Sequence, residues 1–196
     1  MNLPNKLTMI RIFIIPFIVI IFFLNKQIDK VLDNLSLYIM GVLFIAASVT
    51  DYFDGKIARA RNIVTTFGKF IDPLADKLLV TTTLILLSNY YYVNLNGLFM
   101  WMPFWVVLIV ITRDLIVTSI RLVAINEGTI VAAKWSGKIK TAFTMVTIVY
   151  YFFIMPFGGD IISIIGMIMT IIFVILTIYS AVDYFLKNKD IIFKEI

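Results

Sequence analysis

Six long apolar stretches, separated by short connections that carry most of the charges, constrain this chain more than any other feature. Broken at charges, glycines and prolines, they cover approximately residues 7–24, 35–59, 69–91, 98–124, 136–156 and 161–186. A helix needs about 20 residues to cross the roughly 30 Å hydrocarbon core of a bilayer. The pattern therefore predicts an all-α, polytopic membrane protein with six transmembrane helices, forming a single domain over residues 1–196.

The composition agrees with this interpretation and limits the chemistry. Hydrophobic residues make up 61% and charged residues 15% of the 196 positions, whereas soluble domains carry about 25% charged residues. The sequence contains no cysteine and no histidine, which excludes a disulfide framework, thiolate or imidazole metal ligands and an imidazole base. Metal binding and acid–base chemistry in this chain must therefore depend on carboxylates.

The positive charges predict the orientation. Fifteen of the 17 Lys and Arg residues fall on connections or helix ends that face one side, and only Lys26 and Lys30 fall on the other. Because positive charges are enriched in cytoplasmic loops, we expect both termini in the cytoplasm and the protein in the cytoplasmic, or inner, membrane. The net charge of +5 in so apolar a chain indicates contacts with anionic lipid or phosphate, not with nucleic acid.

Four aspartates form the most informative polar cluster. Asp51, Asp54, Asp72 and Asp76 fall within 26 consecutive positions, although ionisable groups are costly in membrane-spanning segments. Asp51 and Asp54 share one face of the second predicted helix, and Asp72 and Asp76 lie about 40° apart around the third. The short turn between these helices makes them antiparallel neighbours, so that the four carboxylates can converge.

Such a group of hard oxygen donors suits two Mg²⁺ or Mn²⁺ ions, which would polarise phosphate oxygens. The alternative is that the aspartates form interfacial ion pairs with four neighbouring cations, Arg59, Arg61, Lys69 and Lys77. Four acids in this spacing favour the metal site. Gly55 and Ala58 remove bulk from the acidic face and Arg59 can bind a phosphate, although small residues such as these two also serve helix packing in membranes.

The spacing of these residues is specific enough to compare with known families. Residues 51–59 read DYFDGKIAR, eight residues follow, and residues 68–76 read GKFIDPLAD. This pattern resembles the signature of the CDP-alcohol phosphotransferase family at every defined position, both spacers included. The resemblance implies six transmembrane helices, a homodimer, and a catalytic domain that transfers a phosphatidyl or similar group from a CDP-linked donor to an alcohol, with CMP leaving.

The same resemblance implies roles for individual residues. Two divalent ions, Mg²⁺ or Mn²⁺, would bind to Asp51, Asp54, Asp72 and Asp76. Asp76 would also act as the general base. The cytidine diphosphate would be held by a set of small and basic residues, Gly55, Ala58, Arg59 and Gly68.

Three polar residues of the first predicted helix, Asn5, Thr8 and Arg11, are placed to close this CDP-binding pocket. The alternative is that Asn5 or Thr8 caps the start of that helix. Further stretches resemble one branch of the family, whose members use sn-glycerol 3-phosphate as the acceptor. They are residues 2–11, 64–77 and 137–141 (GKIKT), with Arg113, Asp114 and Arg121.

An acceptor that is itself a phosphate ester needs cations outside the nucleotide pocket. Arg113 and Arg121 lie about 80° apart around the fourth helix, and Lys138 and Lys140 follow near the start of the fifth. We expect residues of this group of four to bind sn-glycerol 3-phosphate, the alternative for each being a contact with anionic lipid. Lys138 and Lys140 are about 200° apart on a regular helix, so only one of them can face the pocket.

The sequence thus predicts an enzyme that transfers the phosphatidyl group of CDP-diacylglycerol to sn-glycerol 3-phosphate in phospholipid biosynthesis, with its site facing the cytoplasm. Serine, inositol phosphate or phosphatidylglycerol are the alternative acceptors, and serine leaves the basic residues without a role. A divalent cation transporter would also contain intramembrane carboxylates. Transport sites tend to lie near the midplane, however, and these aspartates are displaced to one side. A structural adaptor would explain the hydrophobicity alone.

Overall fold

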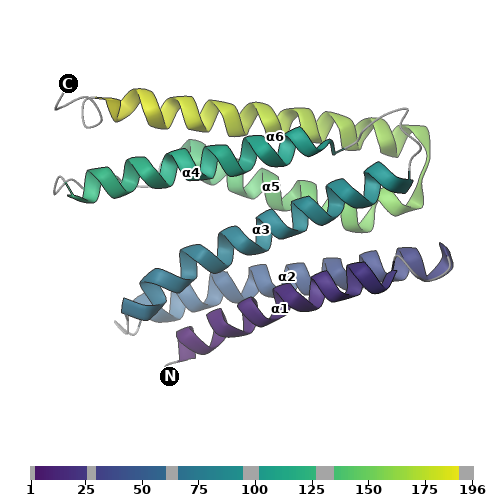
Figure 1. Cartoon of the computed structure of the whole chain (residues 1–196), viewed down its shortest axis with the longest axis horizontal. Coiled ribbons are helices and arrows are strands. Elements are labelled where there is room, and N and C mark those ends of the chain that lie inside the picture. The colour runs from purple at the N-terminus through teal and green to yellow at the C-terminus, as the bar shows by residue number, and fades with distance from the viewer. Residues whose placement is uncertain (1–2, 26–29, 61–65, 95–101, 127–134, 190–196) are drawn as a thin grey trace. The chain divides into compact units, whose positions relative to one another are not determined.

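Six α-helices follow one another along the chain in the computed structural model, which describes residues 3–25, 30–60, 66–94, 102–126 and 135–189. The elements are α1 (Leu3–Asn25), α2 (Lys30–Ala60), α3 (Thr66–Asn94), α4 (Phe104–Asn126), α5 (Trp135–Phe153), the 3₁₀ turn η1 (Met155–Phe157) and α6 (Asp160–Lys187) (Figure 1). No strand occurs in these ranges. The predicted all-α fold with six helices is confirmed.

The helix boundaries depart from the predicted ones chiefly where proline occurs. α4 begins only at Phe104, after the non-helical Pro103, and α5 ends at Phe153, before Pro156. Proline has no backbone N–H and restricts the residue before it, so it favours helix ends. α2 begins earlier than predicted, at Lys30. An apolar run marks the part of a helix that can lie in the membrane, and the helix itself can extend beyond that run.

Four helical stretches are long and apolar enough to cross a bilayer: Asn5–Leu24, Asn34–Asp51, Trp135–Phe157 and Asp160–Lys187. Among the described residues, α3 and α4 do not meet this criterion. Both helices carry charged residues, including Asp72 and Asp76 in α3 and Arg113 and Asp114 in α4. Membrane crossing by α3 and α4 and the cytoplasmic position of both termini therefore stay predictions.

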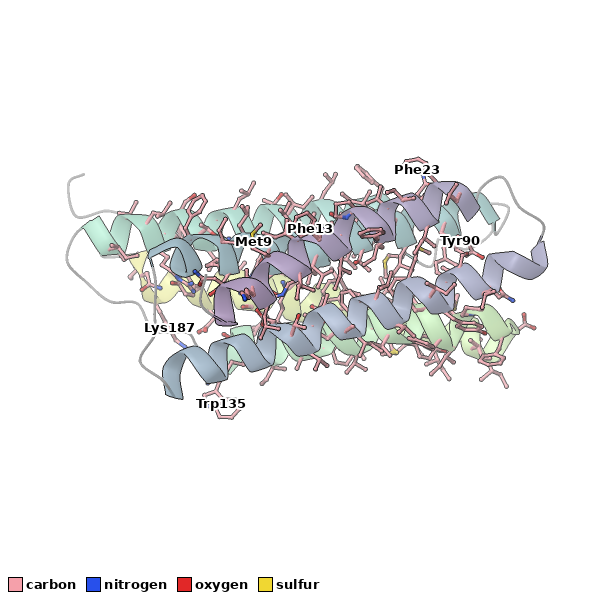
Figure 2. The ribbon with its side chains drawn as sticks, turned by 90° about the horizontal axis from the view of Figure 1, so that it is seen from below. Met9, Phe13, Phe23, Tyr90, Trp135 and Lys187 are labelled. Atoms are coloured by element: carbon pink, nitrogen blue, oxygen red, sulfur yellow. The ribbon has the colours of Figure 1, made fainter. Side chains whose placement is uncertain are left out.

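Large apolar side chains cover the outer faces of the most hydrophobic helices. Phe13 and Phe23 of α1 are each 61% exposed, and Phe23 extends outward from the end of its helix (Figure 2). α6 likewise exposes many of its isoleucines. Such extensive exposed apolar surface is typical of helices that lipid covers.

The chain forms two compact units whose boundaries fall inside α3, inside α5 and between η1 and α6. The first comprises Met1–Leu87 with Tyr151–Gly158, and the second comprises Ser88–Tyr150 with Gly159–Ile196. In the first unit α1 packs along α2 (Figure 1). In the second unit α4 packs against α6, where Val117, Ile120 and Tyr184 form a buried cluster.

A glycine permits close packing within the first unit. A Cβ atom at Gly41 would lie 2.6 Å from Phe153 Cε2 and 2.9 Å from Phe152 Cβ. Tyr38 stacks on Phe153 with ring centroids 5.9 Å apart, and Phe44 lies 6.2 Å from the Phe152 ring. The absence of a side chain at Gly41 therefore lets the end of α5 press its aromatic residues onto α2.

Candidate active site

Two polar residues of α1, Thr8 and Arg11, hold acidic side chains from two other helices. They lie three positions apart, on neighbouring turns of one helix face, and both are buried. Thr8 Oγ1 donates a 2.6 Å hydrogen bond to Asp72 Oδ1 of α3. Arg11 Nη1 lies 2.7 Å from Asp51 Oδ1 of α2. Two of the four predicted metal-binding aspartates therefore contact the same stretch of α1.

The ion pair between Arg11 and Asp51 is asymmetric. The Arg11 side chain is 0% exposed, whereas that of Asp51 is 45% exposed. An isolated charge away from water is very costly, so the buried guanidinium requires an anionic partner. Asp51 supplies that partner and still presents part of its carboxylate at the protein surface.

Asp72 and Asp76 lie one turn apart in the first part of α3, and both are half-buried. Pro73 stands between them inside the helix. Because Pro73 has no N–H, it cannot donate the usual helix hydrogen bond to the carbonyl of Lys69. The helix is therefore locally weakened at the turn that presents these two acids.

The other residues predicted to bind CDP also belong to the first unit. Asn5 is buried within α1, and Gly68 is buried near the start of α3. Since Leu3 is already helical, the alternative that Asn5 or Thr8 caps α1 is wrong. α2 contains Asp54, Gly55, Ala58 and Arg59, whose side chains lie outside the described part of the structure.

The donor chemistry of the first unit suits Mg²⁺ or Mn²⁺. The predicted ligands are carboxylate oxygens, and Thr8 and Arg11 orient two of them in the way that neighbouring donors orient metal-binding carboxylates. Within the described side chains, no group of three or more acidic residues is gathered as a metal site, and Asp54 falls outside that set. The residues fit the ions, while the four-ligand site stays a prediction.

A second buried polar network connects α4, α5 and α6. Arg113 Nη1 lies 2.9 Å from Asp114 Oδ1, and Lys140 Nζ lies 3.4 Å from the same oxygen. Arg113 Nη2 donates a 2.7 Å hydrogen bond to Ser180 Oγ of α6. Lys140 and Ser180 are buried, and Arg113 and Asp114 are largely so. Two cations share one anion, which leaves these four side chains with a net positive charge.

One donor of Arg113 has no acceptor in this network. Its Nε atom is buried and makes no hydrogen bond to any residue that the structure describes. A buried N–H left unsatisfied costs about 1–3 kcal/mol. Guanidinium and ammonium groups bind phosphate oxygens well, so a phosphate is the kind of ligand that this cluster can accept.

The other two predicted phosphate-binding cations have different surroundings. Lys138 is exposed, with Nζ 5.4 Å from the centroid of the Trp135 ring, a distance suited to a cation–π contact. Trp135 itself extends outward from the ribbon (Figure 2), and Arg121 is exposed. Lys138 and Lys140 therefore face different environments, as their spacing predicts, and Lys140 is the buried one.

Three participants were not predicted from the sequence in these roles: Arg11 as the partner of Asp51, Asp114 as the shared anion, and Ser180. In the sequence, Asp114 stands out only beside Arg113, among the residues that resemble one branch of the family. Ser180 is 67 positions away from Arg113 along the chain. The available signal was weak: Thr170, Thr177 and Ser180 recur at helical spacing on the buried face of α6.

The long apolar helices and the buried network of Arg113, Asp114, Lys140 and Ser180 define the class of the protein: an all-helical membrane protein with charged groups held between its helices. Comparison with known proteins identifies the family. Residues 1–179 match the family model described as CDP-alcohol phosphatidyltransferase. The chain therefore belongs to the CDP-alcohol phosphatidyltransferase family, as its signature residues imply.

Several relatives resemble the chain over most of its length. A protein of Bacillus subtilis named CDP-diacylglycerol–glycerol-3-phosphate 3-phosphatidyltransferase is 43% identical over 145 residues, which are 71% of this chain and 70% of the relative. A protein of the same name from Wigglesworthia glossinidia brevipalpis is 34% identical over 190 residues, covering 94% of this chain and 93% of the relative. The Escherichia coli K12 protein of that name is 34% identical over 154 residues, which are 76% of this chain and 75% of the relative.

Proposed function

We propose that this protein transfers the phosphatidyl group of CDP-diacylglycerol to sn-glycerol 3-phosphate, giving phosphatidylglycerophosphate and CMP in phospholipid biosynthesis. The observation that carries the proposal is the similarity, over 94% of this chain, to a relative named for this reaction. The buried cations Arg113 and Lys140 support an acceptor that bears a phosphate. An acceptor without one, such as serine, gives these cations no function.

The acidic residues are proposed to hold two divalent ions, Mg²⁺ or Mn²⁺, through Asp51, Asp54, Asp72 and Asp76. When bound, the ions would offset the negative charge of the diphosphate and of the departing CMP. The contacts of Thr8 and Arg11 with Asp72 and Asp51 support this assignment, because a ligand that is held in place loses less freedom on binding a metal.

The reaction is a single displacement at phosphorus. The acceptor hydroxyl oxygen forms a bond to the β-phosphorus of CDP-diacylglycerol, and the bond from that phosphorus to the oxygen bridging to CMP breaks. The electron pair of the broken bond leaves with CMP. Asp76 accepts the hydroxyl proton as the general base, a role that typically contributes about 10²–10⁴-fold to the rate.

The two substrates are assigned to residues of different units. For the cytidine diphosphate we assign Asn5, Thr8, Gly55, Ala58, Arg59 and Gly68, all in the first unit. For the phosphate of sn-glycerol 3-phosphate we assign Arg113 and Arg121 together with one of Lys138 and Lys140, all in the second unit. Arg113 and Lys140 have the stronger support because Lys140 is buried, Arg113 is largely so, and the two share Asp114.

The protein is further proposed to act as a homodimer in the cytoplasmic, or inner, membrane, surrounded by membrane lipid. Its active site would face the cytoplasm, where sn-glycerol 3-phosphate is available. The excess of Lys and Arg on one set of connections supports this orientation.

One assay tests the proposed function. The purified protein is incubated with CDP-diacylglycerol, Mg²⁺ or Mn²⁺ and one acceptor at a time, and the release of CMP is measured. We expect CMP with sn-glycerol 3-phosphate, and none after the metal is removed with a chelator. Release only with serine, inositol phosphate or phosphatidylglycerol would contradict the acceptor assignment, and no release with any acceptor would contradict the enzyme activity.

A further inference from the structure

We infer that Asp114 and Ser180 are positioning residues that fix Arg113 and Lys140 for the phosphate group of the acceptor. The inference rests on the proposed function, which assigns the two cations to sn-glycerol 3-phosphate. It adds α6 to the acceptor site and gives functions to two residues that the sequence did not place there.

The guanidinium of Arg113 is held at both of its terminal nitrogens. Nη1 contacts Asp114 Oδ1 at 2.9 Å, and Nη2 donates to Ser180 Oγ at 2.7 Å. A planar guanidinium with both terminal nitrogens held has a fixed plane as well as a fixed position. Its Nε–H, buried and without an acceptor in the described residues, therefore has a fixed direction too.

Asp114 brings the second cation to the same place. Lys140 Nζ lies 3.4 Å from the Oδ1 atom that Arg113 also contacts. Two positive charges this close would repel each other strongly in a buried environment unless an anion lies between them. Asp114 thus keeps Arg113 and Lys140 together, so that both cations can act on the same phosphate.

Ser180 differs from the two buried threonines of its helix. Thr177 Oγ1 donates to the carbonyl of Phe173 at 2.8 Å, and Thr170 Oγ1 donates to the carbonyl of Gly166 at 3.0 Å, both within α6. Ser180 instead accepts a hydrogen bond from a side chain of another helix. Its hydroxyl therefore acts on the orientation of Arg113, which a residue that only satisfied α6 would not do.

The test compares Ser180→Ala with a matched control, Thr177→Val. Each variant removes one buried hydroxyl from the same face of α6, but only the first removes a bond to Arg113. We expect Ser180→Ala to raise the KM for sn-glycerol 3-phosphate about tenfold, the usual effect of losing a hydrogen bond to a charged group. The kcat and the KM for CDP-diacylglycerol should change less than about twofold, as for loss of binding to one substrate. Thr177→Val should resemble the wild type in all three parameters.

A conservative pair at Asp114 gives a second measurement. Asp114→Asn retains an oxygen that accepts from Arg113 but lacks the charge that holds Lys140, whereas Asp114→Ala lacks both. We expect the KM for sn-glycerol 3-phosphate to increase in the order wild type, Asp114→Asn, Asp114→Ala. Thermal unfolding in the presence of sn-glycerol 3-phosphate, without CDP-diacylglycerol, reports binding of this acceptor without turnover. The ligand concentration needed to raise the unfolding midpoint should increase in the same order, from wild type to Asp114→Asn to Asp114→Ala.

The outcomes separate this inference from the proposed function. If the wild type releases CMP with sn-glycerol 3-phosphate but Ser180→Ala keeps the wild-type KM, the positioning role is wrong and the function stands. If Ser180→Ala and Thr177→Val both raise the KM for sn-glycerol 3-phosphate and the KM for CDP-diacylglycerol to a similar extent, the two hydroxyls serve helix packing. That result also overturns the inference. If the wild type releases no CMP with this acceptor, the proposed function fails and the positioning role fails with it.

Discussion

At the level of single residues, the three buried or largely buried cations described around the proposed sites all contact carboxylates. Arg11 contacts Asp51, and both Arg113 and Lys140 contact Asp114. A charge away from water is tolerated only with such a partner. These contacts offset the cost of removing the charges from water, and they also fix the positions of the charged groups. Stabilising the charge of a reacting phosphate requires groups that are fixed in this way.

The first prediction concerns the proposed general base. Asp76→Asn keeps the size of the side chain and removes its ability to accept a proton, so CMP release should fall about 10²–10⁴-fold. Binding of CDP-diacylglycerol, measured without acceptor, should largely survive. Asp160→Asn, at the exposed start of α6, serves as the control and should keep wild-type turnover. Retained activity in Asp76→Asn would remove Asp76 as the base.

The second prediction concerns the hydrogen bond from Thr8 to Asp72. Thr8→Val preserves the side-chain volume and removes the donor that orients the carboxylate. The concentration of Mn²⁺ or Mg²⁺ that gives half-maximal activity should rise about 10–100-fold, as for other losses of a group that orients a metal ligand. Thr147→Val is the control, because Thr147 is buried and donates to the carbonyl of Phe143 within its own helix. An unchanged metal requirement with a raised KM for CDP-diacylglycerol would instead limit Thr8 to the CDP site.

At the level of the helices, hydrophobicity predicted where each helix lies but not where it begins and ends. The ends of α4 and α5 depend on Pro103 and Pro156, which interrupt the helix within apolar sequence. Apart from the antiparallel pairing predicted for the second and third helices, the hydrophobic pattern did not indicate which helices contact one another. The packing of α5 aromatic residues onto α2 at Gly41 is one example, since a single glycine in an apolar run has many explanations.

The third prediction tests this packing. Gly41→Ala places a Cβ atom 2.9 Å from Phe152 Cβ, closer than two carbons can approach, so the aromatic residues must shift. We expect the free energy of unfolding to fall by about 1–3 kcal/mol, the usual cost of overpacking a core. Thermal unfolding in detergent measures the change.

A second glycine on a helix provides the comparison for Gly41. A Cβ atom at Gly137 would lie 3.7 Å from Arg113 Nη2, an ordinary contact distance. Gly137→Ala should therefore keep the thermal stability of the wild type. Equal effects of the two substitutions would contradict the argument from close packing and indicate a general response of these helices to alanine.

At the level of the whole molecule, the residues proposed to bind metal and those proposed to bind the acceptor phosphate fall in different compact units. The first unit contains Asp51, Asp72 and Asp76, and the second contains Arg113 and Lys140. This division corresponds to the proposed reaction, in which carboxylates hold metal ions and a base while cations hold an anionic acceptor.

The fourth prediction concerns the orientation in the membrane. The chain has no cysteine, so single cysteines can be introduced as specific labels. Lys189→Cys, exposed just after α6, should react with a membrane-impermeant maleimide only from the cytoplasmic side, in inverted vesicles. Phe157→Cys, exposed in η1, should react only from the opposite side, in intact cells. Labelling of both from the same side would contradict the predicted orientation.

The sequence by itself determined the class of fold and the family, and it singled out the acidic residues that are proposed to bind metal. Hydrophobic stretches of membrane-spanning length leave few alternatives to helices, and residues close together in the chain, such as Asp72 and Asp76, share a helix face through local geometry alone. Only the tertiary structure decided which partners hold these groups. The contacts of Thr8 with Asp72, Arg11 with Asp51 and Arg113 with Ser180 join residues on different helices, and long-range packing, not local spacing, determines which side chains meet there.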